Sequence, residues 1–310
     1  MPALITHHIF GEDAYPSLPE EIVSGEEELL AYLLGNQGPD PFFMRFTGGP
    51  SANRVSRKLA HDLQSSRTTR AFLAARDAVS HLPEDDKRIG RAFVLGMVGH
   101  YVLDRTVHPF VYAQQAALID ADPTLGASAS ELHAVIESDI DTWLLWEKRH
   151  ATVHERPADA NLMRTERTGR VAGAIFSQVA FSVYALNLGA EQYAGAVGDY
   201  EFICRLADPA GSPHVRVAGA IERMVRGNSM AEALSHYVRR SRECPAANLE
   251  HGEWENPFTH KKSAESFPDL YELALADYPA LAEAVARGNK DVLANLVAGL
   301  NYEGRPDCDD

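Results

Sequence analysis

The chain has 310 residues, of which 45% are hydrophobic and 24% are charged, an ordinary balance for a globular protein. Its formal net charge of −15 argues against non-specific binding to nucleic acid or to an anionic membrane, since both are polyanions. Cys204, Cys244 and Cys308 form no C-x-x-C pair, which fits a reducing compartment and offers no thiolate metal site.

The first residues carry no secretion signal. Residues 1–8 have neither a basic n-region nor a long apolar h-region. No stretch approaches the run of about 20 apolar residues that a membrane span needs. We therefore expect a cytoplasmic protein without a transmembrane segment, and the sequence carries no indication of its oligomeric state.

Helical periodicity dominates the chain, and the alternating pattern of strands is hard to find. Gly, Pro and Asp separate the helical segments. Neither an internal repeat nor a break in composition marks a boundary, so we predict one all-α domain over residues 1–310. The predicted helices are, in chain order, Glu26–Leu34, Ala52–Leu63, Thr69–His81, Lys87–Val107, Ala129–Lys148, Asp159–Ala185, Ala190–Leu206, Val215–Arg226, Met230–Arg242, Phe267–Ala276 and Tyr278–Arg287.

The helical pattern has expected interruptions. Pro109 should end the long helix near Val107, because a proline disfavours helical geometry in the residue before it. Gly35–Pro50 and Ala246–Ser266 are irregular, and long ordered loops in compact domains are often functional. The second stretch contains Trp254 and other apolar residues, so we expect a packed C-terminal flap from about residue 246.

Three pairs of metal-binding residue types occur at helical spacing. His100 and Asp104, Asp104 and His108, and His133 and Glu137 are each four residues apart. Residues at this spacing share a helix face, so each pair could converge on one ion, and imidazole and carboxylate are ligands of catalytic zinc. Because the run before Asp104 is apolar, unpaired burial of these groups would cost several kcal/mol. A metal cluster is the simplest compensation, although His100 and Asp104 could instead satisfy each other as a buried pair.

These residues belong to a longer series of segments along the chain. They are Ile5–Gly11, Gly38–Phe43, Gly99–Asp104 with His108-Pro109, His133 with Glu137, and a later stretch with Asn248, His251, Trp254 and Pro257 that is followed by Ser266-Phe267 and Leu270-Tyr271. Their order and context resemble the zinc-dependent phospholipase C family, in its bacterial intracellular branch. That family shares its fold with the zinc-dependent single-strand nucleases. The resemblance implies a single-domain bundle of many helices.

The resemblance also implies eight ligands for two or three zinc ions. In secreted members of the family the third ion is held in addition by an N-terminal tryptophan, and this chain begins with Met1-Pro2 instead. The implied ligands are Asp40, His61, His100 and Asp104 for the first zinc, His108, His133 and Glu137 for the second, and His7, with Asp104 as a bridge, for the third.

Several of these ligands have alternatives. His8 competes with His7 from another helix face, His61 could be an exposed helical histidine, and Asp40 could be a turn aspartate after Pro39. Hydrogen-bond acceptors outside the metal ligands should orient the imidazoles by contacting the ring nitrogen that does not face the metal. Glu131, Asp139 and Asp141 lie nearby in the sequence without an assigned role.

The implied chemistry is the hydrolysis of a phosphoester. Two zinc ions would lower the pKa of a shared water toward about 7 and bind the phosphoryl oxygens. Asp40 is the candidate catalytic residue, because its second oxygen could orient or deprotonate the attacking water. A phospholipid, a soluble phosphodiester, a phosphomonoester and a nucleotide all remain open as substrates, whereas nucleic acid is disfavoured by the net charge.

Two other functions compete with this one. His61 and Asp62 could be the doublet of an HD-type phosphohydrolase, but that interpretation leaves His108, His133 and Glu137 unexplained. Alternatively, the fold could serve as a metal-binding or interaction scaffold with weak or no catalysis. The missing N-terminal tryptophan favours the scaffold.

Overall fold

The structure is a computed structural model that describes residues 3–18, 23–212, 215 and 230–307. Within these residues it is all-α, as predicted, with one short antiparallel hairpin. The α-helices are α1 (Leu4–Ala14), α2 (Glu26–Gly35), α3 (Pro50–Ser65), α4 (Thr68–Ser80), α5 (Lys87–Ala121), α6 (Ala129–Arg149), α7 (Glu166–Tyr184), α8 (Glu191–Ala207), α10 (Met230–Ala233), α11 (Phe267–Arg287) and α12 (Lys290–Val297). Short 3₁₀ helices span Tyr15–Ser17, Asp40–Met44, Glu84–Asp86, Pro123–Ser128, Ala158–Leu162 and Pro245–Ala247.

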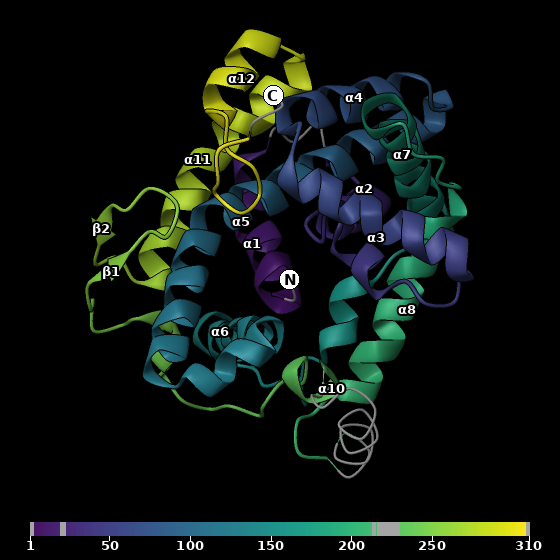
Figure 1. Cartoon of the computed structure of the whole chain (residues 1–310). Coiled ribbons are helices and arrows are strands. Elements are labelled where there is room, and N and C mark those ends of the chain that lie inside the picture. The colour runs from purple at the N-terminus through teal and green to yellow at the C-terminus, as the bar shows by residue number, and fades with distance from the viewer. Residues whose placement is uncertain (1–2, 19–22, 213–214, 216–229, 308–310) are drawn as a thin grey trace.

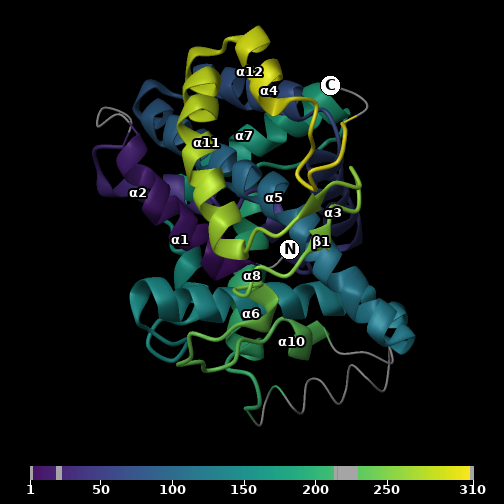
Figure 2. The same cartoon turned by 90° about the vertical axis from the view of Figure 1, so that its left-hand side faces the viewer.

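Helix α5 runs through the middle of the molecule, and most of the other long helices pack against it: α1, α2, α4, α6, α7 and α11 (Figure 1). Helices α2 and α11 lie along α5, and α1 lies against α5, α6 and α11. Figure 2 shows α6 crossing one end of this bundle. Every residue of α5 from Ala92 to Asp104 is buried, which explains its apolar run, because a helix that is apolar on all sides is covered on all sides.

A pair of glycines lets α2 and α5 cross at close range. A Cβ atom on Gly35 would lie 2.2 Å from the carbonyl oxygen of Phe93, and a Cβ on Gly96 would lie 2.0 Å from that of Tyr32. Neither position therefore accommodates a larger side chain. This contact brings the end of α2, and Asn36 directly after it, against the middle of α5.

The prediction that Pro109 ends the long helix is wrong, because α5 continues through it to Ala121. Pro109 cannot donate to the carbonyl of Arg105, and an interior proline costs a helix about 3 kcal/mol. Packing around the following turn offsets this cost: Phe110 is fully buried, and its ring meets that of Trp254 at 5.4 Å. Tertiary contact thus overrides the local preference.

Other helix boundaries also differ from the prediction. Helix α1 was not predicted, because its buried side includes the polar residues Thr6 and His7, so its apolar residues do not form a clear stripe at helical spacing. Helix α12 was missed as well. The predicted helices Phe267–Ala276 and Tyr278–Arg287 form the single helix α11, which tolerates Pro279 in its interior.

Two predicted helices are shorter than expected. Asp159–Ala185 is divided, because Thr165 and Thr168 form a capping box that starts α7 at Glu166. Of Met230–Arg242 only the four residues of α10 are helical. The predicted helix Val215–Arg226 lies outside the described residues except for Val215.

The predicted flap contains the hairpin of β1 (Trp254–Glu255) and β2 (Lys262–Ser263), in which Trp254 pairs with Ser263. Its aromatic side chains pack on the second half of α5: Trp254 on Phe110, and Phe258 on Tyr112 at a ring distance of 5.5 Å. Among the described helices, none has the length and apolar character that crossing a membrane requires.

Candidate metal centre

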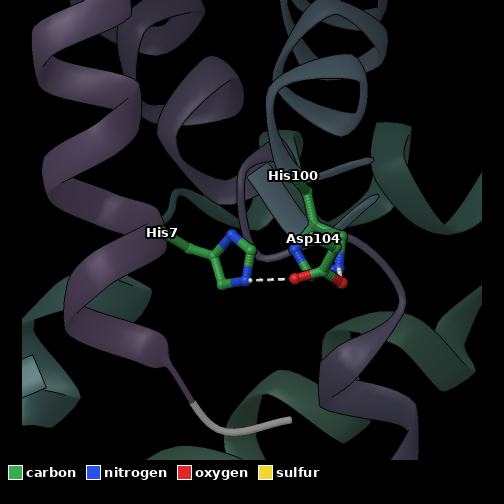
Figure 3. Close-up of side chains that lie close together, drawn as sticks. All are labelled: His7, His100 and Asp104. Carbon is green, nitrogen blue, oxygen red and sulfur yellow. Dashed lines mark ion pairs between the residues drawn. The ribbon is translucent and has the colours of Figure 1, made fainter. Parts of the chain in front are cut away.

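The first ligand group consists of His7 from α1 and His100 and Asp104 from α5. Figure 3 shows His7 reaching from α1 toward the carboxylate of Asp104. The Nε2 atom of His7 lies 3.1 Å from Asp104 Oδ1, and the Nε2 atom of His100 lies 3.1 Å from Asp104 Oδ2. All three side chains are buried, and their ligand atoms lie within 4.8 Å of one another, so the group could hold a metal ion.

The second ligand group consists of His108 from α5 and His133 and Glu137 from α6. Glu137 Oε1 lies 3.2 Å from His133 Nε2 and 3.6 Å from His108 Nε2. These ligand atoms also lie within 4.8 Å of one another, so this group too could hold an ion. The four-residue spacing of His133 and Glu137 places both on one face of α6, as the sequence predicted.

Asp104 joins the two groups. Its Oδ1 atom, 3.1 Å from His7, is also 3.9 Å from His108 Nε2. A small cavity of about 20 Å³ lies between the groups, lined by His7, Asp104, His108 and Glu137 and by apolar side chains of α5, α6 and α11. A space of this size holds about one water molecule or ion.

Backbone carbonyls orient two of the imidazoles. His100 Nδ1 lies 3.0 Å from the carbonyl oxygen of Asn36, and His108 Nδ1 lies 2.8 Å from that of Tyr302. Because a carbonyl can only accept, Nδ1 carries the proton in both rings, and the Nε2 atoms face the carboxylates. His100 Nε2 is buried, and its 3.1 Å contact with Asp104 Oδ2 lacks the geometry of a hydrogen bond, so this atom has no hydrogen-bond partner within the described part of the chain. Histidine ligands of metals are typically oriented in this way, by a hydrogen-bond acceptor on the ring nitrogen that does not face the metal.

His133 is oriented by a side chain instead. Its Nδ1 atom lies 3.1 Å from Gln115 Oε1. Sequence reasoning missed this partner, although Gln115 follows His108 by seven residues and so lies on the same face of α5. It also missed Asn36 and Tyr302, which act through main-chain carbonyls and therefore leave no signal in side-chain identity.

Burial and neighbouring charges have opposing effects on the pKa values of the buried histidines. Burial lowers the pKa of a histidine, but Asp104 and Glu137 raise the pKa of His108 to about 9. Against the effect of burial, Asp104 also raises the pKa of His100. Burial and the charge of His100 lower the pKa of His7, whose ring stacks on that of His100 at 4.1 Å. Two stacked imidazoles repel each other when both are protonated, which is why the pKa values of His7 and His100 shift in opposite directions.

Asp40 lies beside the first group. It is buried, its Oδ1 atom is 3.7 Å from His100 Nε2, and the same oxygen accepts a hydrogen bond of 2.8 Å from Gln64 Nε2. Gly38, two residues earlier, has a φ of +51°, and a Cβ there would lie 2.5 Å from the His100 ring. Glycine at this position is therefore required both by the left-handed backbone and by the approach of the loop to His100.

The structure does not bring His61 to either group. His61 is exposed on α3, and its ring packs edge-on against that of Phe43 at 4.8 Å. Gln64, one turn further along α3, is the residue that reaches Asp40. Asp62 pairs with Lys58 at 2.8 Å, so the doublet expected for an HD-type phosphohydrolase lies apart from both ligand groups.

His7 rather than His8 faces the centre. His8 Nε2 lies 3.6 Å from Glu12 Oε1, one turn along α1 and away from Asp104. Seven of the eight predicted ligands thus lie in or beside the two groups, and His61 does not.

No protein-family model, curated protein or solved structure matches this chain.

Proposed function

We propose that this chain is a zinc-dependent phosphoester hydrolase of the phospholipase C type. One observation carries the proposal: two buried groups of histidine and carboxylate ligands share Asp104. Nitrogen and oxygen donors in such sets suit catalytic zinc. Paired ions a few ångströms apart are typical of enzymes that displace groups at phosphorus.

The residues present fit the ions. His7, His100 and Asp104 would hold one zinc, with Asp40 beside it, and the second group would hold another. The donor types, the fixed Nδ1 atoms and the buried Nε2 of His100 without a hydrogen bond support this assignment. His61 has no part in the proposed site, because it lies on the exposed side of α3.

Bound zinc would lower the pKa of water and neutralise charge on the phosphoryl group. The chain itself would orient the reactants. We assign Asp40 the role of holding the attacking water and accepting its proton at Oδ2, because Gln64 fixes Oδ1. The apolar side chains that border the cavity between the groups exclude bulk water, which strengthens every electrostatic interaction inside.

A second candidate is a metal-binding scaffold without turnover. The small size of the cavity between the groups, about 20 Å³, favours it, because a phosphoryl group needs more room than one water. On this alternative the ions would tie α1, α5 and α6 together, and the buried carboxylates would be compensated without any reaction.

The first test is metal content, measured by elemental mass spectrometry on protein purified without added metal. We expect about two zinc ions per chain, mostly lost when His100 and Asp104 are both replaced by alanine. His61→Ala is the matched control, because it removes an exposed histidine and should leave the metal content unchanged. Folded, chelator-free wild-type protein without metal would overturn the proposal.

The second test separates the hydrolase from the scaffold. Zinc-loaded protein is assayed with bis(4-nitrophenyl) phosphate, 4-nitrophenyl phosphate and phosphatidylcholine vesicles, beside Asp40→Asn. Turnover that falls at least about a hundredfold in Asp40→Asn while zinc stays bound would support the role of Asp40. Bound zinc with no turnover of any substrate would favour the scaffold.

A further inference from the structure

Helix α1 has no capping side chain of its own. Ala3 precedes it, and the first N–H groups of a helix have no partner within the helix. Asp141 of α6 supplies the missing acceptors: Oδ1 accepts from the N–H of Thr6 at 2.7 Å, and Oδ2 accepts from that of Ile5 at 3.1 Å. Asp141 is completely buried, so this cap lies inside the protein.

Asp141 lies on the helix face that carries the second ligand group. His133, Glu137 and Asp141 follow one another at intervals of four along α6 and therefore share one face. His7 comes directly after Thr6 in α1. One face of α6 thus provides two ligands of the second group and the cap of the helix that carries the first ligand of the other group.

His236 compensates the charge of Asp141. Its Nε2 atom lies 3.2 Å from Asp141 Oδ2, and its Nδ1 atom lies 3.0 Å from the carboxylate of Asp208, directly after α8. A buried carboxylate without such a partner would cost several kcal/mol. Asp141 is thus paired with His236 through Oδ2 while Oδ1 remains directed at Thr6.

The ring of His7 is held in a different way from the other imidazoles. Carbonyl oxygens fix His100 and His108, and Gln115 fixes His133, whereas His7 Nδ1 is buried without a hydrogen-bond partner among the described residues. The position of its Nε2 atom therefore depends on where α1 is docked. The first turn of α1, next to His7, is the part that Asp141 holds.

We propose that Asp141 is a positioning residue, which places His7 against Asp104 by capping α1 and so keeps the two metal groups in register. The inference rests on the metal centre of the proposed function and does not require turnover. In the part of the chain that the structure describes, Asp141 does not hydrogen-bond to the imidazole of a ligand in either metal group. It acts through main-chain N–H groups of the neighbouring helix α1.

The test compares Asp141→Asn with Asp208→Asn in zinc-loaded protein. Both variants remove one carboxylate from His236, but only Asp141 contacts α1. His7→Asn identifies the ion that depends on His7. We expect Asp141→Asn to release this ion to a chromogenic chelator after a loss of affinity of about 10- to 100-fold. The ion of the second group should stay bound, and Asp208→Asn should behave as the wild type.

Two results would overturn the inference: wild-type zinc release in Asp141→Asn, or an equal loss in both variants, which would indicate general destabilisation. If Asp141→Asn does not fold, amide hydrogen exchange in the wild type decides. Exchange at Ile5 and Thr6 should slow when zinc is added, and unchanged exchange would refute the coupling. Wild-type protein that binds no zinc overturns the metal centre as well, whereas bound zinc without hydrolysis removes only the proposed activity.

Discussion

Replacing Gly96 by alanine should push α2 away from α5 and disturb both the fold and the metal centre. The new Cβ would lie 2.0 Å from the carbonyl oxygen of Tyr32 and 2.8 Å from Cα of Gly35. These are backbone atoms, so no change of rotamer relieves the overlap, and the helices have to separate by roughly 1 Å to approach normal contact. Overpacking of this kind costs about 3 kcal/mol at the upper end of its usual range.

A glycine-to-alanine change inside a helix also gains about 1 kcal/mol of helix propensity. The net loss in the free energy of unfolding should therefore be about 2 kcal/mol. Gly198→Ala in α8 is the matched control, because its Cβ would meet only the Arg164 guanidinium at 3.6 Å. That variant should be as stable as the wild type or up to about 1 kcal/mol more stable.

Urea unfolding followed by far-ultraviolet circular dichroism measures both values. In addition, moving α2 displaces the Asn36 carbonyl from His100, so the affinity for zinc should fall by about tenfold in Gly96→Ala. A Gly96→Ala protein that is at least as stable as the wild type would refute the argument from the helix crossing. Unchanged zinc affinity in a destabilised variant would refute the link between the crossing and His100.

Three further predictions follow from other parts of the structure. Burial lowers the pKa of His236, but hydrogen bonds to Asp141 and Asp208 outweigh burial and raise the pKa to about 10. Protonated His236 therefore contributes its full stabilisation of the fold below about pH 6.5, and this contribution is lost as the pH rises toward 10. Unfolding free energies from pH 6 to 10.5 should therefore fall more steeply for the wild type than for His236→Gln, and equal slopes would contradict this. Removal of metal by EDTA should destabilise the protein by about 3 kcal/mol for each zinc ion lost, relative to protein with free zinc at a hundred times the dissociation constant of that site. Added zinc should restore the loss, and a thermal midpoint that does not respond to EDTA would speak against the centre. Thr165→Ala should cost about 1 kcal/mol in urea unfolding by removing the capping box of α7, and no measurable loss would show that the box is dispensable.

The sequence determined those features that depend on neighbouring residues. Helical periodicity located most of the long helices, and the four-residue spacing of His100, Asp104 and His108 put three ligands on one face of α5. The same spacing paired His133 with Glu137 on α6. These predictions hold because 3.6 residues complete one helical turn whatever the helix packs against.

Tertiary structure decided the features that depend on how the helices dock. The sequence did not indicate that α1 is a helix or that α5 passes through Pro109. It left open whether His61 is a ligand or an exposed histidine, and it did not indicate that Gln64 reaches Asp40. The orientation of His100 depends on a carbonyl at the end of α2, and Asp141 acts on main-chain N–H groups of another helix. Main-chain groups are the same in every residue, so only their placement in space gives them a role, and that placement arises when the helices pack together.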